Sequence, residues 1–285
     1  MKYIEIKAPA KINIGLNIVD KREDGYHNLE TFFYPICDLY DKLTFELANE
    51  FSFSQTQDAS IKYQEKINSN LVVKAKELLE KITGKKLNVN IKLRKNIPIG
   101  AGLGGGSSDA AATLISLNEL FRLNIRYDKL IELALTLGSD VPFFLKAKPS
   151  TGKSRGEILT IKEFDLPYYI VIVNPNIHVS TKEAFQNISP KNSSIDYEKV
   201  FNSVEAFLSN KNEIVNDFEE YVFLKYPAVK EIKDCLTDIG SEFTSMSGSG
   251  SSVYGFFKSK ELVVDIKSKF PDDYFIFISS PDQII

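Results

Sequence analysis

The chain has 285 residues, of which 35 are Lys or Arg and 38 are Asp or Glu, so its formal net charge is −3. Hydrophobic residues make up 43% and charged residues 26%, which excludes global disorder, collagen and coiled-coil rods. A net charge near zero argues against nucleic-acid binding through the overall field, although backbone amides could still form a local anion site. The length fits one large domain or two of ordinary size.

The two cysteines, Cys37 and Cys235, lie far apart and have no metal-ligand spacing around them. We therefore expect half-buried free thiols rather than a structural zinc site or a disulfide framework. Charged residues interrupt the apolar pattern at the N-terminus, and no window is apolar over the roughly 18 residues that a membrane span needs. We expect a cytoplasmic protein, a monomer or homodimer, with no membrane or nucleic-acid partner.

The first half of the chain mixes strands and helices. Apolar residues alternate with polar ones over residues 10–18, which predicts a strand with one buried face and places Lys11 and Asn13 together on the other, non-core side. A glycine run precedes the helix expected at 110–123. Further strands are expected at 31–37, 42–47 and 87–93, and helices at 71–82, 110–123 and 127–137.

Residues 146–155 are polar and rich in Gly, Ser and Pro, which predicts a domain boundary. We expect domains at 1–153 and 154–285, with the option that the last strand, within 274–285, joins the first domain. Strands and helices without a strict βαβ repeat favour an α+β fold. In the second half, strands are expected at 168–173, 252–257 and 274–278, and helices at 181–187, 197–208, 227–236 and 260–270.

The most informative segment is PIGAGLGGGSSDAAATL, residues 98–114, with five glycines in seven residues. Glycine leaves the backbone open to a ligand, and Ser107, Ser108 and Asp109 are good N-cap residues for the helix that follows. An amide-lined loop that leads into a helix N-terminus is typical of a phosphate site. Asp109 would repel a triphosphate unless a cation lies between them or its carboxylate faces away, and the sequence leaves both open.

Other glycine-rich loops fit this segment less well. Gly100, Gly102 and Gly105 match the G-x-G-x-x-G dinucleotide fingerprint, but the next segment predicts a helix where that fold needs a strand with an acidic end. A Walker A loop is excluded because no lysine follows the glycines. A mobile linker is disfavoured because so well-capped a helix follows at once.

Two further segments are candidates for chemistry. In LGSDVPFF, residues 137–144, Gly138 can end the preceding helix in the left-handed conformation, and Asp140 is either the cap of a short helix or a carboxylate that accepts a hydroxyl proton. Lys11 is either an exposed strand lysine or a cation that neutralises a transferring phosphoryl group. SMSGSGSSVYGFF, residues 245–257, predicts a second small-residue turn that could bring amides against a phosphate.

Four segments in this order, APAKINIGL, PIGAGLGGGSSDAA, LGSDVPFF and MSGSGSSVYG, resemble the motifs of the GHMP kinase superfamily, the galactokinase–homoserine–mevalonate–phosphomevalonate group. The opening block, residues 8–33 with its DGYH element, resembles the branch that acts on 4-(cytidine 5'-diphospho)-2-C-methyl-D-erythritol. The resemblance spans essentially the whole chain. It implies a two-domain α+β GHMP kinase fold, with a mixed or antiparallel sheet in the N-terminal ATP-binding domain and an α+β substrate-side domain after it.

The resemblance also implies that ATP, with Mg²⁺, phosphorylates the 2-hydroxyl of the methylerythritol unit in the non-mevalonate route to isoprenoid precursors. Asp140 matches the catalytic base and Lys11 its charged partner. Tyr26 and Phe185 match positions that sandwich the cytosine ring and His27 its hydrogen-bonding edge, while the methylerythritol and its phosphates lie near Asn13, Thr181 and Gly248. The residues that match the ATP site are Pro98, Gly100, Ala101, Gly102, Leu103, Gly104, Gly105, Gly106, Ser107 and Ser108.

Two alternatives remain, and the metal ligands are open because no second carboxylate stands out. The chain could be a GHMP kinase for homoserine or a mevalonate derivative, against which the DGYH element and Phe185 argue. It could also be a catalytically silent nucleotide sensor on the same fold, against which the retention of both Lys11 and Asp140 argues.

Overall fold

The computed structural model describes residues 2–62, 70–190 and 195–281. The chain forms two compact units that interleave along the sequence. The first unit is Met1–Ala10, Leu39–Ile99 and Gly104–Ala147, and the second is Lys11–Asp38, Gly100–Leu103 and Lys148–Ile285. This division differs from a single boundary after residue 153, because two long strands, β1 (Tyr3–Lys21) and β2 (His27–Leu47), each contribute to both units.

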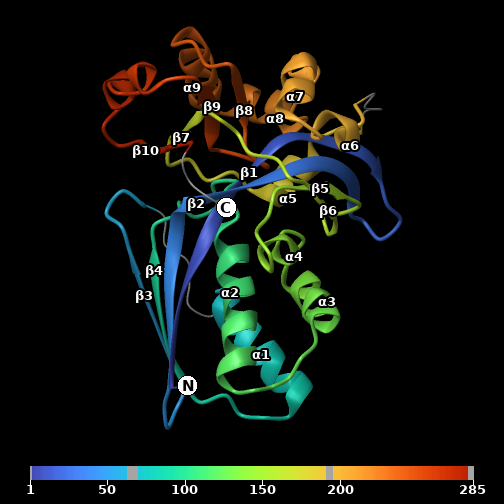
Figure 1. The fold of residues 1–285 in the computed structure, drawn as a ribbon, viewed down its shortest axis with the longest axis vertical. Helices are drawn as coiled ribbons and strands as arrows, with labels where there is room; N and C mark the ends of the chain where they lie inside the picture. Colours follow the sequence, from blue (N-terminus) through green and yellow to red (C-terminus); the bar gives the residue numbers. More distant parts are fainter. Residues whose placement is uncertain (1, 63–69, 191–194, 282–285) are drawn as a thin grey trace. The chain divides into compact units, whose positions relative to one another are not determined.

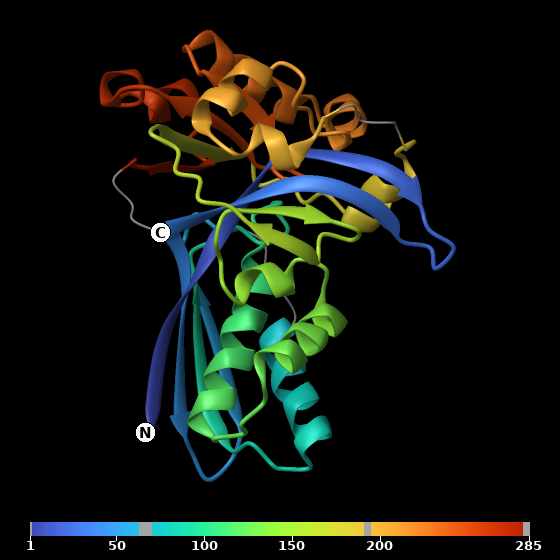
Figure 2. The same ribbon diagram turned by 45° about the vertical axis from the view of Figure 1, so that its right-hand side comes forward.

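In the first unit, helices lie along one side of a small mixed sheet, as Figure 1 and Figure 2 both show. The second half of β2 pairs antiparallel with β4, and β4 pairs parallel with β3. Alternate residues of β4 are buried, which is the period of a strand with one face on the core. The bounds are β3 (Ser52–Gln57), β4 (Val89–Lys95), α1 (Leu71–Thr83), α2 (Gly105–Leu120), α3 (Tyr127–Leu137) and α4 (Val141–Phe144).

The second unit contains an antiparallel sheet in the order β10–β7–β9–β8. Helix α9 packs on β8 and β9, over an apolar cluster that includes Val171, Ile232 and Val253. The first half of β2 pairs with β5, which pairs with β6. The bounds are β5 (Ser150–Lys153), β6 (Ile158–Ile161), β7 (Tyr169–Asn174), α5 (Thr181–Gln186), α6 (Tyr197–Val200), α7 (Val204–Asn210), α8 (Phe218–Lys225), α9 (Pro227–Asp238), β8 (Phe243–Met246), β9 (Val253–Phe257) and β10 (Phe275–Ser279).

The α+β fold is confirmed, and several predicted elements need correction. The strands expected at 31–37 and 42–47 are one continuous strand, β2. The helix expected at 260–270 is wrong: the segment forms short 3₁₀ turns, Lys260–Leu262 and Ile266–Lys269. Buried Val263, Ile266 and Phe270 keep a helix-like spacing, which misled the prediction, but i to i+3 hydrogen bonds hold the turns.

Other differences concern the division of a helix and the pairing of strands in the second unit. The helix expected at 197–208 is two helices, because Ser203 caps a new one, α7, through Ala206 N–H. The polar segment 146–155 contains β5, which pairs with β2 and is therefore part of a sheet rather than a linker. The last strand, β10, pairs with β7 of the second unit and does not join the first.

The predicted state of the two cysteines is confirmed. Cys37 and Cys235 are both free and half-buried. Within residues 2–62, 70–190 and 195–281, no helix combines the length and apolarity required to cross a membrane.

Candidate functional site

Strand β1 carries the first two predicted site residues. Lys11 and Asn13 lie on the same side of the strand, as predicted, but that side is not exposed: each residue is only 2% accessible. All residues from 10 to 18 are buried, so the alternation of polar and apolar residues marks two different buried environments. The alternative of an exposed strand lysine is therefore wrong for Lys11, because hydrogen-bond partners from distant segments cover it.

Those partners come from the glycine-rich loop and from the turn after β8. Lys11 Nζ donates to Asn13 Oδ1 and, at 2.9 Å, to Gly102 O. Ser247 Oγ donates to the same carbonyl at 2.9 Å and accepts from Asn13 N–H at 3.2 Å. Within the second unit the fold therefore brings together three of the four predicted motifs.

The contact between the two glycine turns requires glycine. Gly102 has φ +79°, and a Cβ there would lie 2.0 Å from Ser247 O, far inside van der Waals contact. A Cβ on Gly248 would lie 3.3 Å from both Lys11 Nζ and Gly102 O. Asn216 Nδ2 holds the second turn by donating to the carbonyls of Met246 and Gly248. Ser247 and Asn216 are thus site residues that sequence reasoning missed; Asn216 has no motif around it that could have revealed it.

The first half of the glycine-rich loop is anchored in the second unit through its backbone. Leu103 O accepts from Lys11 N–H at 3.0 Å, and Ala101 O accepts from Ser252 N–H at 3.1 Å. Its second half, from Gly104 to Ser108, belongs to the first unit, as do Pro98 and Asp140. The predicted ATP-binding residues are therefore divided between the two units.

Helix α2 begins earlier than predicted. Its N-cap is Gly104, at φ 72°, which has no side chain to cap the helix, and the first intrahelical bond runs from Ser108 N–H to Gly104 O at 2.9 Å. Ser107, Ser108 and Asp109 therefore lie inside the helix instead of capping it. The first amides of the helix, from Gly105 to Ser107, have no acceptor within it and stand at its positive dipole end, as an anion site requires.

Asp140 stands at the N-cap position of α4 and is half-buried. Its side chain makes no capping hydrogen bond to α4, so capping does not account for this carboxylate. The residue before the turn, Gly138, is extended, with φ 170°, rather than left-handed as predicted. A Cβ on Gly138 would lie 3.9 Å from Ser107 Oγ, which places this turn beside the start of α2. The pairing of Asp140 with Lys11 stays a prediction.

Asp109 is 2% exposed, and its Oδ2 accepts from Lys95 Nζ at 2.7 Å. Lys95 also pairs with Asp41. Burial raises the pKa of Asp109 to about 8, with Lys95 opposing the shift and Asp41 adding to it. Lys95 is therefore the cation that pairs with Asp109, a partner that the sequence left open. Sequence reasoning missed Lys95 and Asp41, although Lys95 continues the inward period of Val89, Ile91 and Leu93.

The predicted cytosine residues lie in the second unit. Tyr26 is 49% exposed, and the guanidinium carbon of Arg155 lies 3.8 Å from its ring centroid. His27 stacks on Phe185, with centroids 5.1 Å apart and planes at 23°. Burial lowers the pKa of His27, and Lys21 adds to this effect. The sandwich of a base between Tyr26 and Phe185 stays a prediction, and Arg155 is a neighbour that no sequence pattern indicated.

Thr181 is the first helical residue of α5, after its N-cap Ser180. Its hydroxyl lies 3.0 Å from Ser249 Oγ, in hydrogen-bond contact. Because Ser249 follows Gly248, this contact joins α5 to the second glycine turn.

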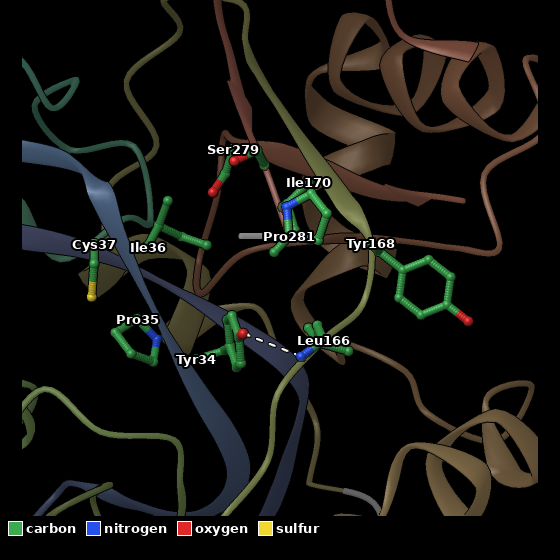
Figure 3. A pocket seen from close by; sticks show the side chains of 10 residues that line it. Tyr34, Pro35, Ile36, Cys37, Leu166, Tyr168, Ile170, Ser279 and Pro281 are labelled. Carbon is green, nitrogen blue, oxygen red and sulfur yellow. Dashed lines mark hydrogen bonds between the residues drawn. The ribbon is translucent and has the colours of Figure 1, made fainter. Parts of the chain in front are cut away.

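Figure 3 shows a small cavity of the second unit that is not this site. Its volume, about 20 Å³, suits about one water molecule. Tyr34 Oη accepts a hydrogen bond from Leu166 N–H at its edge. None of the predicted site residues lines it; the walls are Tyr34, Pro35, Ile36, Cys37, Leu166, Tyr168, Ile170, Ser279, Ser280 and Pro281. In the part of the chain that the structure describes, no three His, Cys, Asp or Glu side chains gather to hold a metal.

Known structures share this fold. A crystal structure of 4-(cytidine 5'-diphospho)-2C-methyl-D-erythritol kinase superposes with a TM-score of 0.79 and 30% identity, over 96% of this chain and 98% of that one. A homoserine kinase from Cytophaga hutchinsonii superposes with a TM-score of 0.70 at 18% identity, a likeness that concerns the fold alone.

The sequence matches the family models for the GHMP kinases N terminal domain, over residues 70–148, and GHMP kinases C terminal, over residues 197–276. The 4-diphosphocytidyl-2-C-methyl-D-erythritol kinase of Azobacteroides pseudotrichonymphae is 46% identical, over 87% of this chain and 91% of the relative. Its counterpart from Bacteroides fragilis is 43% identical, over 89% and 92%. These matches confirm the resemblance: the chain is a kinase and belongs to the 4-diphosphocytidyl-2-C-methyl-D-erythritol kinase family of the GHMP kinases.

Proposed function

We propose that this kinase transfers the γ-phosphoryl group of ATP to the 2-hydroxyl of 4-(cytidine 5'-diphospho)-2-C-methyl-D-erythritol, in the non-mevalonate synthesis of isoprenoid precursors. The observation that carries the proposal is the 40–46% identity, over most of the chain, to kinases named for this substrate. The geometry of α2 supports it, because a helix start without a side-chain cap suits the phosphates of a nucleotide.

We assign the phosphates to the backbone of Pro98 and of Gly100–Ser108. The amides of the first turn of α2 can donate to phosphate oxygens, and glycine lets the ligand approach the backbone closely. Mg²⁺ neutralises part of the phosphate charge when it is bound. Ser108 Oγ, buried at this helix start and without a hydrogen-bond partner in the described structure, is the side-chain oxygen that would hold it. Asp109 is instead committed to Lys95.

The proposed reaction needs one proton acceptor and a cation. The Asp140 carboxylate takes the proton of the 2-hydroxyl, whose oxygen bonds to the γ-phosphorus as the bond from that phosphorus to the bridging oxygen breaks and ADP leaves. Lys11 supplies positive charge to the transferring group. The protein then contributes mainly alignment and charge stabilisation.

The proposal also assigns residues that bind the cytidine substrate. Tyr26 and Phe185 stack on the cytosine, a contact worth roughly 1–3 kcal/mol per base. The lowered pKa of His27 favours its neutral ring, which has one donor and one acceptor for the edge of the base. Asn13, Thr181 and Gly248 lie near the methylerythritol and its phosphates. A cytoplasmic location and a monomer or homodimer complete the proposal. The functional division into an ATP-binding part, 1–153, and a substrate-side part, 154–285, follows the sequence and crosses the two compact units, since residues 11–38 and 100–103 belong to the second unit.

The test is mass spectrometry of the products after incubation with MgATP and one acceptor at a time. We expect a phosphorylated product with the cytidine-diphospho substrate and none with homoserine or mevalonate. Product from homoserine or mevalonate alone would refute the assigned substrate. ATP binding in calorimetry without product from any acceptor would instead support a nucleotide sensor.

A further inference from the structure

Three buried ionisable side chains of the first unit gather where the glycine-rich loop begins and ends. Lys95 is the last residue of β4, Asp41 belongs to β2, and Asp109 to the first turns of α2. Their side chains are only 4%, 0% and 3% exposed. Buried charges are costly unless they are paired, and two carboxylates share one ammonium here. This cost indicates that the cluster of Lys95, Asp41 and Asp109 has a structural or functional role.

The strand period directs these charges inward. Val89, Ile91 and Leu93 are the buried residues of β4, and Lys95 follows them in the same period. Asp41 is likewise in register with buried Leu43 and Phe45 of β2. The ion pair between Lys95 and Asp41 is therefore built into the core face of the sheet.

Asp41 fixes the start of the loop. Its Oδ1 accepts from the backbone N–H groups of Asn96 and Ile97, at 2.6 and 2.9 Å, while its Oδ2 pairs with Lys95. One carboxylate therefore holds three successive residues at the point where the chain leaves β4. Hydrogen bonds to a charged acceptor are stronger than those between neutral groups.

Lys95 fixes the end of the loop. Its ammonium donates to Asp109 Oδ2 at 2.7 Å. A Cβ on Gly105 would lie 3.1 Å from the same Nζ, so the ammonium packs directly against the first residue of α2. Lys95 thus contacts α2 at two positions one turn apart, Gly105 and Asp109.

We propose that Lys95 and Asp109 are positioning residues, which hold the first turn of α2 in place for the nucleotide phosphates. The inference rests on the proposed function, in which residues from Gly104 to Ser108 bind those phosphates. Amides can align on an oxyanion only if the turn that carries them is held in place. Loss of the contact between Lys95 and Asp109 therefore weakens ATP binding while the acceptor binds as before.

A pair of substitutions at one position provides the test. Asp109→Leu and Asp109→Asn both remove the ionisable carboxyl group and leave Lys95 with Asp41, but only Asn offers Lys95 an acceptor. We expect the KM for ATP to rise on the order of tenfold in Asp109→Leu and to stay within about twofold of the wild type in Asp109→Asn. The KM for the acceptor should not change. Amide hydrogen exchange over residues 104–110 should be faster in the Leu variant alone.

Lys76→Met is the matched control. Lys76 is another buried lysine of the first unit, paired with Glu80 at 2.9 Å on α1. We expect this variant to lower the melting temperature without raising the KM for ATP. If it raises that KM as much as Asp109→Leu does, the loop effect is not specific and the inference fails.

Other outcomes are equally decisive. Equal losses in Asp109→Leu and Asp109→Asn would mean that the ionisable carboxyl group matters and the contact with Lys95 does not, which contradicts the inference. A folded Leu variant with an unchanged KM for ATP would refute the inference alone. Should the Leu variant not fold, Asp109→Ala, which a helix tolerates, replaces it with the same expectation. A wild-type protein that neither binds ATP nor forms product would refute the proposed function, and the inference with it.

Discussion

The two halves of the glycine-rich loop contain the same residue type for different physical reasons. In the first half, Gly102 combines a positive φ with an approach to Ser247 O that no side chain could enter. In the second half, Gly104 also has a positive φ, but Gly105 and Gly106 are helical. A Cβ on Gly105 would crowd Lys95 Nζ at 3.1 Å, whereas one on Gly106 would meet only Leu71 Cδ1 at 3.7 Å. A glycine motif therefore mixes strict positions with tolerant ones, and only the surroundings separate them.

The anchors of the two halves differ as well. Lys11 and Ser247 hold the first half through hydrogen bonds to a backbone carbonyl. The second half is held by a buried ion cluster. We therefore expect substitutions in the first half to lower the free energy of unfolding through steric clashes. The contribution of the second half to that free energy should change with pH.

The largest effect is expected at Asp140, which lies next to the second half of the loop and acts in the proposed proton transfer. Asp140→Asn should lower kcat by about two to four orders of magnitude, the range typical of a general base, with little change in ATP affinity or melting temperature. Steady-state kinetics and calorimetry measure this. Asp128→Asn, at an exposed carboxylate on α3, is the control and should leave kcat unchanged. Full turnover in Asp140→Asn would disprove the assigned role.

The strict position of the first half comes next. Gly102→Ala should reduce the free energy of unfolding by about 3 kcal/mol or more, because strain at positive φ adds to the clash with Ser247 O. Urea denaturation measures the loss. A loss below about 1 kcal/mol would mean that the two turns can separate at little cost.

Tyr26 tests whether the second unit serves the acceptor. Tyr26→Ala should raise the KM for the cytidine substrate by about five- to a hundredfold, the loss of one stacked base, and leave that for ATP within about twofold. Tyr127→Ala is a matched control, since Tyr127 is also half-exposed and lies beneath a cation, Lys146. Equal losses for both substrates would show that the aromatic assignment is misplaced.

The ion cluster gives the second half a pH dependence. The pKa of Asp109 is raised from 3.8 to about 8 in the folded protein, so the unfolded chain releases this proton first as the pH rises. As the pH rises from about 4 to about 8, Asp109 should therefore make the free energy of unfolding fall, by up to roughly 1.4 kcal/mol per pH unit. Above about pH 8 it should cause no further change. Denaturation at several pH values should show a shallower slope in Asp109→Asn. Identical slopes would place the titration elsewhere.

The smallest effect is expected at the tolerant position. Gly106→Ala should raise the free energy of unfolding by up to about 1 kcal/mol, because alanine favours the helix and its methyl group meets only Leu71 Cδ1 at 3.7 Å. Thermal denaturation beside Gly102→Ala gives the comparison directly. A clear loss at Gly106 would erase the difference between the halves.

Local pattern was enough for much of the fold. Period two predicted a strand over residues 10–18, within β1, and helical spacing predicted α1. Strand-like runs predicted β4 and β7, and the glycine run before an alanine-rich segment predicted a helix start that suits an anion. These features depend on neighbours within a few residues, which the sequence displays directly. The order of the four motifs also indicated the family without any structure.

Tertiary structure alone decided which polar residues are buried and what they meet. The sequence placed Lys11 and Asn13 on the non-core side of a strand and left open whether Lys11 is exposed. Gly102 and Ser247, far along the chain, cover this side in the folded protein. From the sequence, Asp109 would repel a nearby phosphate; in the structure it pairs with Lys95. A buried charge is tolerated only when a partner lies within hydrogen-bond distance, and that partner is selected by the packing of strands and helices rather than by position along the sequence.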